Sequence, residues 1–397
     1  MKLAKRMDII PFQPIRIIVE EATRREKQGK KIVHLEIGRP DFDTPCHIKE
    51  AAINAISEGK VHYTSNYGIP ELRDVIAQKF KQDNDLVFDP SDEIIVTVGA
   101  TEGIFLTMMA LLDPGDEVII LTPSFPCYAQ CAKMAQAIPV FVPLKQANNF
   151  EPVIADCIEK ITPKTKMIVI NTPHNPTGAV YSETILKALA QIAIDNDLFV
   201  LSDEIYEKNI YDGYTHFSIA RLPGMHERTI TLNGFSKSHC MTGWRLGYLA
   251  SCRQIIAGLI RIHQYVTVCA TSFAQYGAVA ALTGSQEEVE KMTREFDRRR
   301  IMMVKRLLHM PGISVFEPKG AFYIFVNVEN IGMSSQDLST YLLDEASIAV
   351  VPWGDTHIRI SYANSYENLE TAMDNMAAAL KKLNDSRPKK ETPAREN

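Results

Sequence analysis

The sequence predicts an α/β protein with a large domain, whose mostly parallel mixed sheet is flanked by helices, and a smaller C-terminal α+β domain. Between residues 46 and 284, short apolar runs rich in β-branched residues alternate with helix-like stretches. These runs are apolar throughout, as expected for strands that helices cover on both faces. A chain of 397 residues is also long enough for two or three domains.

The predicted elements follow one another in a regular order. Residues 1–45 form an arm, a helix over 15–29 and a short strand over 32–38, and we assign part of this segment to the small domain. Helical patterns, such as those at 101–112 and 183–197, separate the strands of the large domain. Seven strands are predicted there, at 92–99, 117–122, 139–144, 165–171, 198–203, 229–234 and 245–251.

The C-terminal region, residues 285–383, has a different pattern. One long amphipathic helix is predicted over 285–310. Four strands are predicted after it, at 313–318, 321–328, 348–352 and 357–363. The polar, charged and proline-containing residues 384–397 predict a disordered tail.

Composition narrows the possible classes of function. The formal net charge of −5 offers no basic footprint for nucleic acid, and no apolar run approaches the about 20 residues of a bilayer span. The 7 cysteines, an odd number scattered along the chain, favour reduced thiols over a disulfide framework. Cys127 and Cys131 have helical spacing, which we attribute to packing and not to a metal site. We therefore expect a soluble cytoplasmic protein that binds no metal, nucleic acid or membrane.

Three chemically different side chains follow the ends of successive predicted strands: Asn175, Asp203 and Lys237. Ligands of open α/β sheets bind at the carboxyl ends of the strands, so these side chains can share one site. Each could also have a purely structural role, since asparagine stabilises turns, aspartate caps helices and lysine is normally solvated. A buried Asp203 would need a cationic partner. Tyr206, three residues later, can serve the same ligand.

Lys237 and Arg245 lie in the segment "FSKSHCMTGWRLGY". A lysine in a desolvated pocket has a lowered pKa and becomes nucleophilic toward carbonyl groups. A buried Arg245 needs an anion, and its guanidinium suits phosphate. In "VTVGATEGI" a strand turns through Gly99 into a predicted helix whose free N–H groups can bind phosphate. Together these features predict the covalent and ionic ends of one cofactor site.

The segments "YTSNYGIPELR", "GATEGI", "NTPHNPTGAVY", "SDEIYE", "FSKSHCMTGWRLGY", "GAFYIF" and "HIRISYA", in this order, resemble the class I and II aminotransferases. The resemblance spans nearly the whole chain, from "IGRPDFDTP" to "HIRISYA". These are enzymes of the aspartate aminotransferase fold, fold type I, which use pyridoxal 5'-phosphate. The resemblance implies the same fold and cofactor, and a homodimer with shared active sites.

The resemblance also implies a role for each matching residue. Lys237 forms the covalent imine with the cofactor, and Asp203 pairs with the protonated pyridine nitrogen. Tyr206 and Asn175 hydrogen-bond the phenolic oxygen, and Asn175 also contacts the substrate. The other roles are phosphate binding by Arg245, Ser236, Ala100 and Thr101, ring stacking by Phe125, a contact with the neighbouring subunit's phosphate by Tyr63, and substrate carboxylate binding by Arg359 and the backbone of Gly38.

Several of these side chains could instead have a structural role. Phe125 lies where relatives often carry tryptophan or tyrosine, and it could be a core residue. Tyr63 could be an ordinary interface aromatic, and Arg359 a solvated strand residue. Gly234 lies where some branches of the family have a phosphate-binding serine, so that contact is lost or falls to Ser236.

The implied reaction moves an amino group between an L-amino acid and a 2-oxo acid in two half-reactions. A β-lyase reaction on the same fold would use the same residues and stays an alternative. A non-enzymatic effector-sensing domain ranks below both, because only about 45 residues precede the large domain and they resemble the enzymes' own N-terminal segment. The motifs do not specify the amino acid. Arg39 follows Gly38, at a position where relatives often carry an acid. It could bind a second carboxylate of the substrate, but we expect it to form a surface salt bridge instead.

Overall fold

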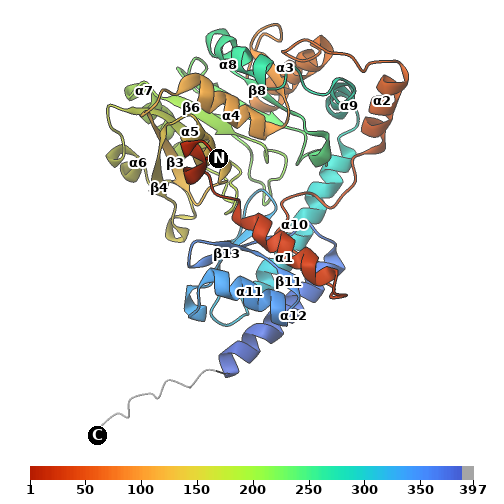
Figure 1. Ribbon diagram of the computed structural model, residues 1–397, viewed down its shortest axis with the longest axis vertical. Coiled ribbons are helices and arrows are strands. Elements are labelled where there is room, and N and C mark those ends of the chain that lie inside the picture. The colour runs from red at the N-terminus through yellow and green to blue at the C-terminus, as the bar shows by residue number, and fades with distance from the viewer. Residues whose placement is uncertain (387–397) are drawn as a thin grey trace. The chain divides into compact units, whose positions relative to one another are not determined.

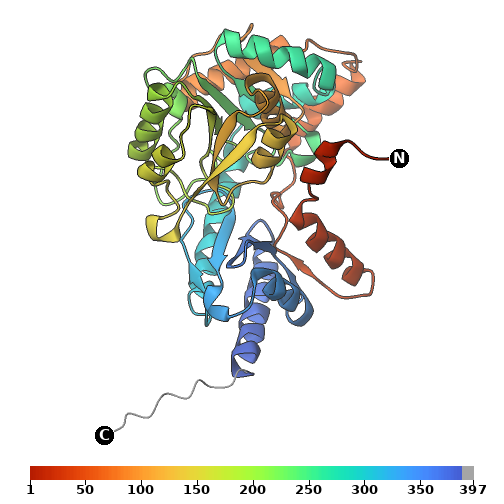
Figure 2. The same cartoon turned by 60° about the vertical axis from the view of Figure 1, so that its left-hand side comes forward.

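The computed structural model describes residues 1–386, apart from the side chain of Pro14, and contains two compact units (Figures 1 and 2). Unit 1 comprises Met1–Phe12, Arg39–Asp297 and Pro318–Tyr323. Unit 2 comprises Gln13–Gly38, Arg298–Glu317 and the chain from Ile324 onward. The sequence placed the change of domain at residue 285, whereas unit 1 continues to Asp297, because the first part of helix α10 (Glu287–Leu307) belongs to it.

Unit 1 is built on a seven-stranded sheet with the order β2-β8-β7-β6-β5-β3-β4 (Figure 1). Neighbouring strands are parallel, except that β8 runs antiparallel to both β2 and β7. This confirms the mostly parallel mixed sheet and all seven predicted strands. The strands are β2 (Ile94–Thr97), β3 (Glu117–Thr122), β4 (Ile138–Pro143), β5 (Thr165–Asn171), β6 (Phe199–Asp203), β7 (Thr229–Gly234) and β8 (Gly247–Ala250).

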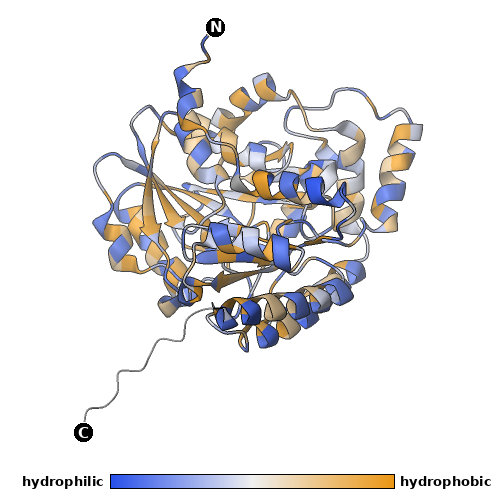
Figure 3. Cartoon of the chain, turned by 60° about the horizontal axis from the view of Figure 1, so that its bottom comes forward, coloured by the Kyte–Doolittle hydropathy of each residue, from blue (hydrophilic) through white to orange (hydrophobic). Residues whose placement is uncertain are grey.

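Helices cover both faces of this sheet, which explains why its strands are apolar throughout. On one face, Ile120, Val169 and Leu201 are buried under α4 (Ala100–Leu111), α5 (Cys127–Met134) and α8 (Arg253–Val266). On the other face, Ile94 and Val96 are buried with α2 (Cys46–Ser57), α3 (Pro70–Asn84) and α9 (Ser272–Thr283). Figure 3 shows these strands mainly in the hydrophobic colour, between helices of mixed character. Each fully buried Ile, Val or Leu side chain contributes about 1.5–3 kcal/mol.

The remaining elements of unit 1 are short or peripheral. They are α6 (Ile154–Glu159), α7 (Glu183–Asp195) and the 3-10 helices η1 (Lys5–Ile9), η2 (Gln146–Asn148), η3 (Ile219–Arg221) and η4 (Thr242–Trp244). α7 begins at a capping serine, Ser182, whose hydroxyl accepts from the backbone N–H of Ile185.

Unit 2 contains a four-stranded sheet with the order β12-β13-β10-β9 and a parallel pair, β1 and β11. The predicted long helix is α10, and the strand predicted over 348–352 is divided into β11 and β12. The other elements are α1 (Pro14–Glu26), β1 (Val33–His34), β9 (Ser314–Val315), β10 (Tyr323–Asn327), η5 (Glu329–Ile331), α11 (Ser335–Glu345), β11 (Ile348–Ala349), β12 (Val351–Trp353), β13 (His357–Ser361) and α12 (Tyr366–Asp385).

The cysteines, the helices and the C-terminal end bear on three further expectations. All seven cysteines are free, and Cys127 and Cys131 pack together inside α5 with their sulfur atoms 3.6 Å apart. Among the helices within residues 1–386, none combines the length and apolarity that a bilayer span requires. The tail predicted over 384–397 lies mostly outside the described residues, and α12 continues through Asp385.

Candidate active site

The carboxyl ends of β5 and β6 lie side by side, with Asn171 in register with Asp203. The amide of Asn171 donates to the backbone carbonyl of Asp203 at 2.9 Å, and its Oδ1 accepts from the backbone N–H of Asn175 at 2.9 Å. Asn171 therefore ties the turn that carries Asn175 to the strand end that carries Asp203. The sequence predicted the convergence of these two residues but not the residue that links them.

Asp203 is buried, with only 4% of its surface exposed. Its carboxylate accepts a hydrogen bond from the hydroxyl of Tyr128 at 2.6 Å and another from the backbone N–H of Ile205 at 3.2 Å. Burial raises the pKa of Asp203 to about 6, and these two hydrogen bonds oppose the shift. The charge of Lys237 also lowers it, which places the two predicted catalytic groups within electrostatic reach. A buried carboxylate of this kind needs a cationic partner.

Lys237 and Tyr206 lie close together in unit 1. The Lys237 ammonium is 6.0 Å from the centre of the Tyr206 ring and 5.9 Å from that of Phe322. Tyr206 and Tyr323 share a hydrogen bond of 2.8 Å between their hydroxyl groups. Lys237 is half-buried, and the rings of Tyr206 and Phe322 form part of its surroundings. The ammonium thus lies among aromatic rings, as expected for a lysine that must react with a carbonyl group.

The phosphate end predicted from the sequence lies at the start of α4. Gly99 precedes this helix with φ +76°, and a Cβ at this position would lie 2.5 Å from Nη2 of Arg245. The guanidinium therefore lies against the first turn of α4, where Ala100 and Thr101 present free N–H groups. Arg245 is exposed, and the expectation of a buried arginine is wrong: the residue precedes β8, at the rim of the sheet.

A close approach of backbones accounts for the glycine where some relatives have a serine. Gly234 ends β7 and pairs with Gly247 at the start of β8. A Cβ on Gly234 would lie 3.0 Å from the Cα of Gly247, and one on Gly247 would lie 2.6 Å from the backbone nitrogen of Ala100. A serine at 234 would therefore force the paired ends of β7 and β8 apart. Ser236 is buried, and its phosphate contact stays a prediction.

A buried acid braces the same helix start. Glu102, in the first turn of α4, accepts from the backbone N–H of Val98, from Thr267 at 2.7 Å and from the ring of His263 at 3.0 Å. Burial alone would raise the pKa of Glu102, but these hydrogen bonds lower it below its usual value. The carboxylate is also favoured by the positive end of the helix. Glu102 is thus a support of the predicted phosphate site that the sequence did not reveal.

The other predicted residues of unit 1 occupy different environments. Phe125 is half-buried and meets the ring of Tyr128 edge-on, with centroids 5.8 Å apart. Tyr63 is 86% exposed. Arg39 is also exposed and forms no ion pair within residues 1–386, so the expected surface salt bridge is wrong.

Unit 2 carries the two residues predicted to bind the substrate carboxylate, Gly38 and Arg359. Arg359 lies on β13 and is buried, with 6% exposure, which contradicts the alternative of a solvated strand residue. Its Nη2 donates to the backbone carbonyl of Glu36 at 2.6 Å. The buried Glu36 carboxylate accepts from His34 at 2.7 Å and raises the pKa of that imidazole to about 9.

Sequence reasoning missed three polar groups that surround the predicted residues: Tyr128, Asn171 and Tyr323. Tyr128 follows Phe125 by three positions, a spacing that puts two residues on one side of a helical turn and could have indicated Tyr128. Tyr323 offers no such signal, because its partner Tyr206 is 117 residues away. Asn171 lies four residues before Asn175, but its link to Asp203 spans 32 residues.

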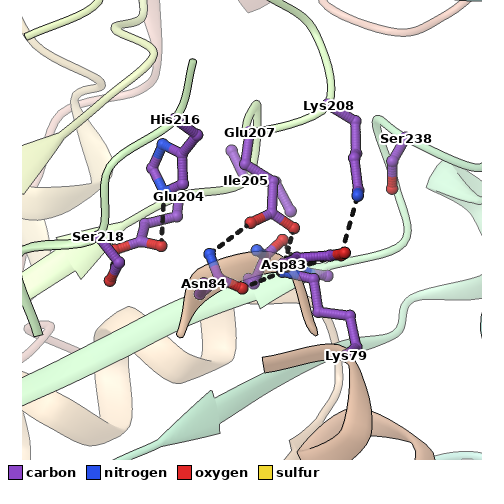
Figure 4. A network of polar contacts seen from close by, with 12 residues as sticks. Lys79, Asp83, Asn84, Glu204, Ile205, Glu207, Lys208, His216, Ser218 and Ser238 are labelled. Atoms are coloured by element: carbon purple, nitrogen blue, oxygen red, sulfur yellow. Dashed lines mark hydrogen bonds and ion pairs between the residues drawn. The ribbon is translucent and has the colours of Figure 1, made fainter. Parts of the chain in front are cut away.

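A network of buried charges lies directly after Asp203 (Figure 4). Glu207 and Lys79 form an ion pair in which each side chain is only 7% exposed. Asn84 hydrogen-bonds both, at 2.7 Å to the ammonium and 3.0 Å to the carboxylate. Burial alone would raise the pKa of Glu207, but the charge of Lys79 lowers this pKa to about 2. In the sequence, Lys79 and Glu207 look like ordinary charged residues.

A transferase of fold type I is the class of protein that this α/β fold and this arrangement of lysine, carboxylate and arginine define. The family model for class I and II aminotransferases matches residues 30–376. The chain is 43% identical over 390 residues to aromatic-amino-acid aminotransferase 2 of Thermococcus litoralis, covering 96% of this chain and 99% of that protein. It is 44% identical over 389 residues to an aspartate aminotransferase of Pyrococcus abyssi, with the same coverage.

A solved structure is similar over the same extent. The aspartate aminotransferase from Thermus thermophilus with maleate superposes with a TM-score of 0.91 and 37% identity, covering 96% of this chain and 100% of that one. The chain belongs to the class I and II aminotransferase family. It is an enzyme that transfers amino groups between amino acids and 2-oxo acids.

Proposed function

We propose that this aminotransferase uses pyridoxal 5'-phosphate, held by Lys237, Asp203 and the start of α4, to exchange an amino group between an L-amino acid and a 2-oxo acid. The observation that carries the proposal is Asp203, a buried carboxylate at a strand end that lies within electrostatic reach of Lys237. The protonated pyridine nitrogen of this cofactor is a cation that such a carboxylate would stabilise.

The other features of unit 1 also fit the cofactor. Arg245 lies against Gly99, so a guanidinium and the free N–H groups of a helix start converge where a phosphate would bind. Tyr206 offers a phenolic hydroxyl in the same region as the Lys237 ammonium. When bound, the cofactor supplies an electron-accepting ring that stabilises negative charge at the substrate Cα.

The chain's own groups then perform the proton transfers. We assign to Lys237 Nζ the removal of the substrate Cα proton and its later return, as general base and then acid. Asp203 keeps its partner nitrogen charged, and Tyr206 and Asn175 hold the phenolic oxygen. We assign the substrate carboxylate to Arg359, because a buried guanidinium with one fixed N–H group suits a carboxylate.

The names of the relatives suggest which amino acids to test. One relative is named for aromatic amino acids and another for aspartate. We propose that the donor is an aromatic or an acidic L-amino acid. A panel of aromatic, acidic and small aliphatic donors, each with 2-oxoglutarate and with pyruvate, tests this: the proposal fails if only the aliphatic donors react.

We also propose a homodimer in which Tyr63 binds the phosphate of the neighbouring subunit. Tyr63 is exposed, yet its segment is fixed, because buried Gln275 donates to Thr64 at 3.1 Å and to the carbonyl of Ala270 at 2.9 Å. Within residues 1–386 no hydrogen bond holds the Tyr63 hydroxyl, which favours a role toward another subunit.

A complementation experiment tests the shared site. Tyr63→Phe and Lys237→Ala variants are mixed and refolded or co-expressed, so that hybrid dimers form. In a hybrid, one site combines the intact Lys237 of one subunit with the intact Tyr63 of the other. Activity should therefore rise above that of either parent variant, and it would not rise if each Tyr63 served its own subunit.

Covalent trapping tests the proposed cofactor and the assigned lysine. Borohydride reduction of the purified enzyme, followed by peptide mass mapping, should place the cofactor on Lys237. Lys237→Ala should lose turnover while retaining some cofactor binding, and Lys145→Ala, a change at an exposed lysine, is the matched control. Adduct formation on another lysine, or full turnover in Lys237→Ala, would refute the assignment.

A further inference from the structure

A second buried carboxylate, Glu204, follows Asp203 directly and is completely shielded from solvent. Its Oε1 accepts hydrogen bonds from the hydroxyls of Ser202 at 2.8 Å and Ser218 at 2.7 Å. Its Oε2 is hydrogen-bonded to Nε2 of His216 at 2.7 Å. All of these groups belong to unit 1, and the family assignment gives none of them a role. Glu204 is therefore a buried, hydrogen-bonded carboxylate directly beside Asp203, and the proposed cofactor contacts do not explain its presence.

His216 supplies the charge that a buried Glu204 requires. Its side chain is 8% exposed, and it faces Glu204 in Figure 4. Burial alone would lower the pKa of His216. The charge and the hydrogen bond of Glu204 raise this pKa above its usual value, and the charge of Glu207 adds to the effect. The imidazole therefore keeps its proton to a higher pH than an exposed histidine. An unpaired carboxylate in this position would be destabilising by several kcal/mol.

Glu204, Glu207 and His216 have ligand atoms within 4.8 Å of one another, as in a metal site. The positive charge that such a cluster needs is already present, however, because the ammonium of Lys79 is paired with Glu207 (Figure 4). Lys79 and a protonated His216 together balance the two glutamates. The cluster is thus an internal ion network and not a cation site.

The network acts on Asp203 through charge and through the backbone. The charge of Glu204 opposes ionisation of Asp203, and a protonated His216 screens that charge. The backbone N–H of Glu204 donates to the carbonyl of Leu232 on β7, and its carbonyl accepts from the N–H of Glu207. Both ends of the turn that follows Asp203 are therefore fixed by the residues that carry the buried charges.

We propose that Glu204 and His216 are a positioning pair that fixes the end of β6 and sets the electrostatic environment of Asp203. The proposal rests on the proposed function for its catalytic meaning, but the effect on Asp203 exists without cofactor. At about 10 Å and an effective dielectric of about 20, one unit charge changes a neighbouring pKa by about one unit.

Three variants separate charge from packing: Glu204→Gln removes the negative charge, His216→Gln removes the positive charge, and Ser218→Ala removes a neutral donor to the same carboxylate. Removal of the negative charge should lower the proton affinity of Asp203 by about one pKa unit, and removal of the positive charge should raise it. Ser218→Ala is the matched control and should leave the proton affinity of Asp203 unchanged. The other titratable neighbours of Asp203 are the same in all three: Tyr128, Cys127 and Lys237.

The first measurement uses the full-length protein without cofactor. Each protein is compared with its own Asp203→Asn derivative by denaturant unfolding between about pH 4 and 8. The folded pKa of Asp203 lies above its unfolded value, so its protonation stabilises the fold at low pH, and this contribution disappears as pH rises through about 6. The midpoint of this disappearance reports Asp203 and should move in opposite directions in the two charge variants.

The second measurement follows the absorbance of the cofactor bound through Lys237 as a function of pH. The midpoint of this titration should shift downward in Glu204→Gln and upward in His216→Gln, since a nearby negative charge favours a protonated imine. If the wild-type protein binds no cofactor, the proposed function fails, and the unfolding measurement still decides the role of the pair. Shifts of the same sign in both charge variants, or shifts no larger than that of Ser218→Ala, would overturn the proposal.

Discussion

Replacing Tyr128 with phenylalanine removes the hydroxyl that donates to Asp203 at 2.6 Å and leaves the aromatic ring in place. The side chain is fully buried, so the lost hydrogen bond cannot be replaced by bulk water. Hydrogen bonds to charged groups contribute about 1.5–3 kcal/mol, which corresponds to about 1–2 pKa units. We therefore expect the pKa of Asp203, about 6 in the wild-type protein, to rise in Tyr128→Phe.

The expected consequence is weaker cofactor binding that depends on pH. Where Asp203 is protonated in the free protein, binding of the cationic ring nitrogen requires the release of that proton. Cofactor affinity should fall by about 5- to 50-fold near pH 6, and the loss should shrink as pH rises above about 8, where the carboxylate is ionised again. Kd values from absorbance or fluorescence titration at several pH values give the ratio directly.

Tyr181→Phe is the matched control for this measurement. Tyr181 is equally buried, but its hydroxyl has no hydrogen-bond partner within residues 1–386. Its removal should leave both the affinity and its pH dependence unchanged. A loss in Tyr128→Phe that is equal at every pH would refute the reasoning, because it would reflect altered packing and not the ionisation of Asp203.

Three further predictions concern stability and the phosphate site. Lys79→Met leaves Glu207 buried without its cation and should destabilise the fold by about 3–5 kcal/mol in denaturant unfolding. Combining it with Glu207→Gln should recover much of this loss, and an unchanged stability in the single variant would contradict the buried pair. Gly99→Ala forces a left-handed φ and a clash with Arg245, so it should weaken binding of pyridoxal 5'-phosphate at least about 10-fold but leave pyridoxal unaffected. Calorimetry with both ligands checks this, and an equal loss for both would exclude a phosphate-specific effect. The pKa of His34 is raised to about 9, so its contribution to stability is complete below about pH 6.5 and is lost as pH rises through about 9. In His34→Gln the unfolding free energy should therefore depend less on pH between about 6.5 and 9. An unchanged pH dependence would argue against a stabilising role of protonated His34.

The sheet and its strand ends were predictable because they depend on local patterns. Buried strands are continuous apolar runs, and the polar residue that ends such a run marks the rim of the sheet. Asp203 and Lys237 could be selected for this reason. The hydrogen-bond partner of Asp203 could not, since Tyr128 lies on α5, 75 residues before Asp203 on β6, and the two meet only in the folded chain.

Burial of individual charged residues was the least predictable property. Arg245 was expected to be buried from its apolar neighbours, but a turn before β8 places it at the exposed rim. Glu204 and Lys79 look like ordinary surface residues in the sequence and are buried in the structure. Their partners are distant in sequence or arise from tertiary packing, which composition and periodicity do not report.

The pairing of Gly234 with Gly247 closes the loop that carries both Lys237 and Arg245. The two strand ends are paired in register and lie against α4. The number of residues in this loop therefore determines the separation between Lys237 and Arg245. An inserted or deleted residue would change this span without altering any catalytic side chain. Loop length, and not only residue identity, should therefore be the property that engineering of this segment must preserve.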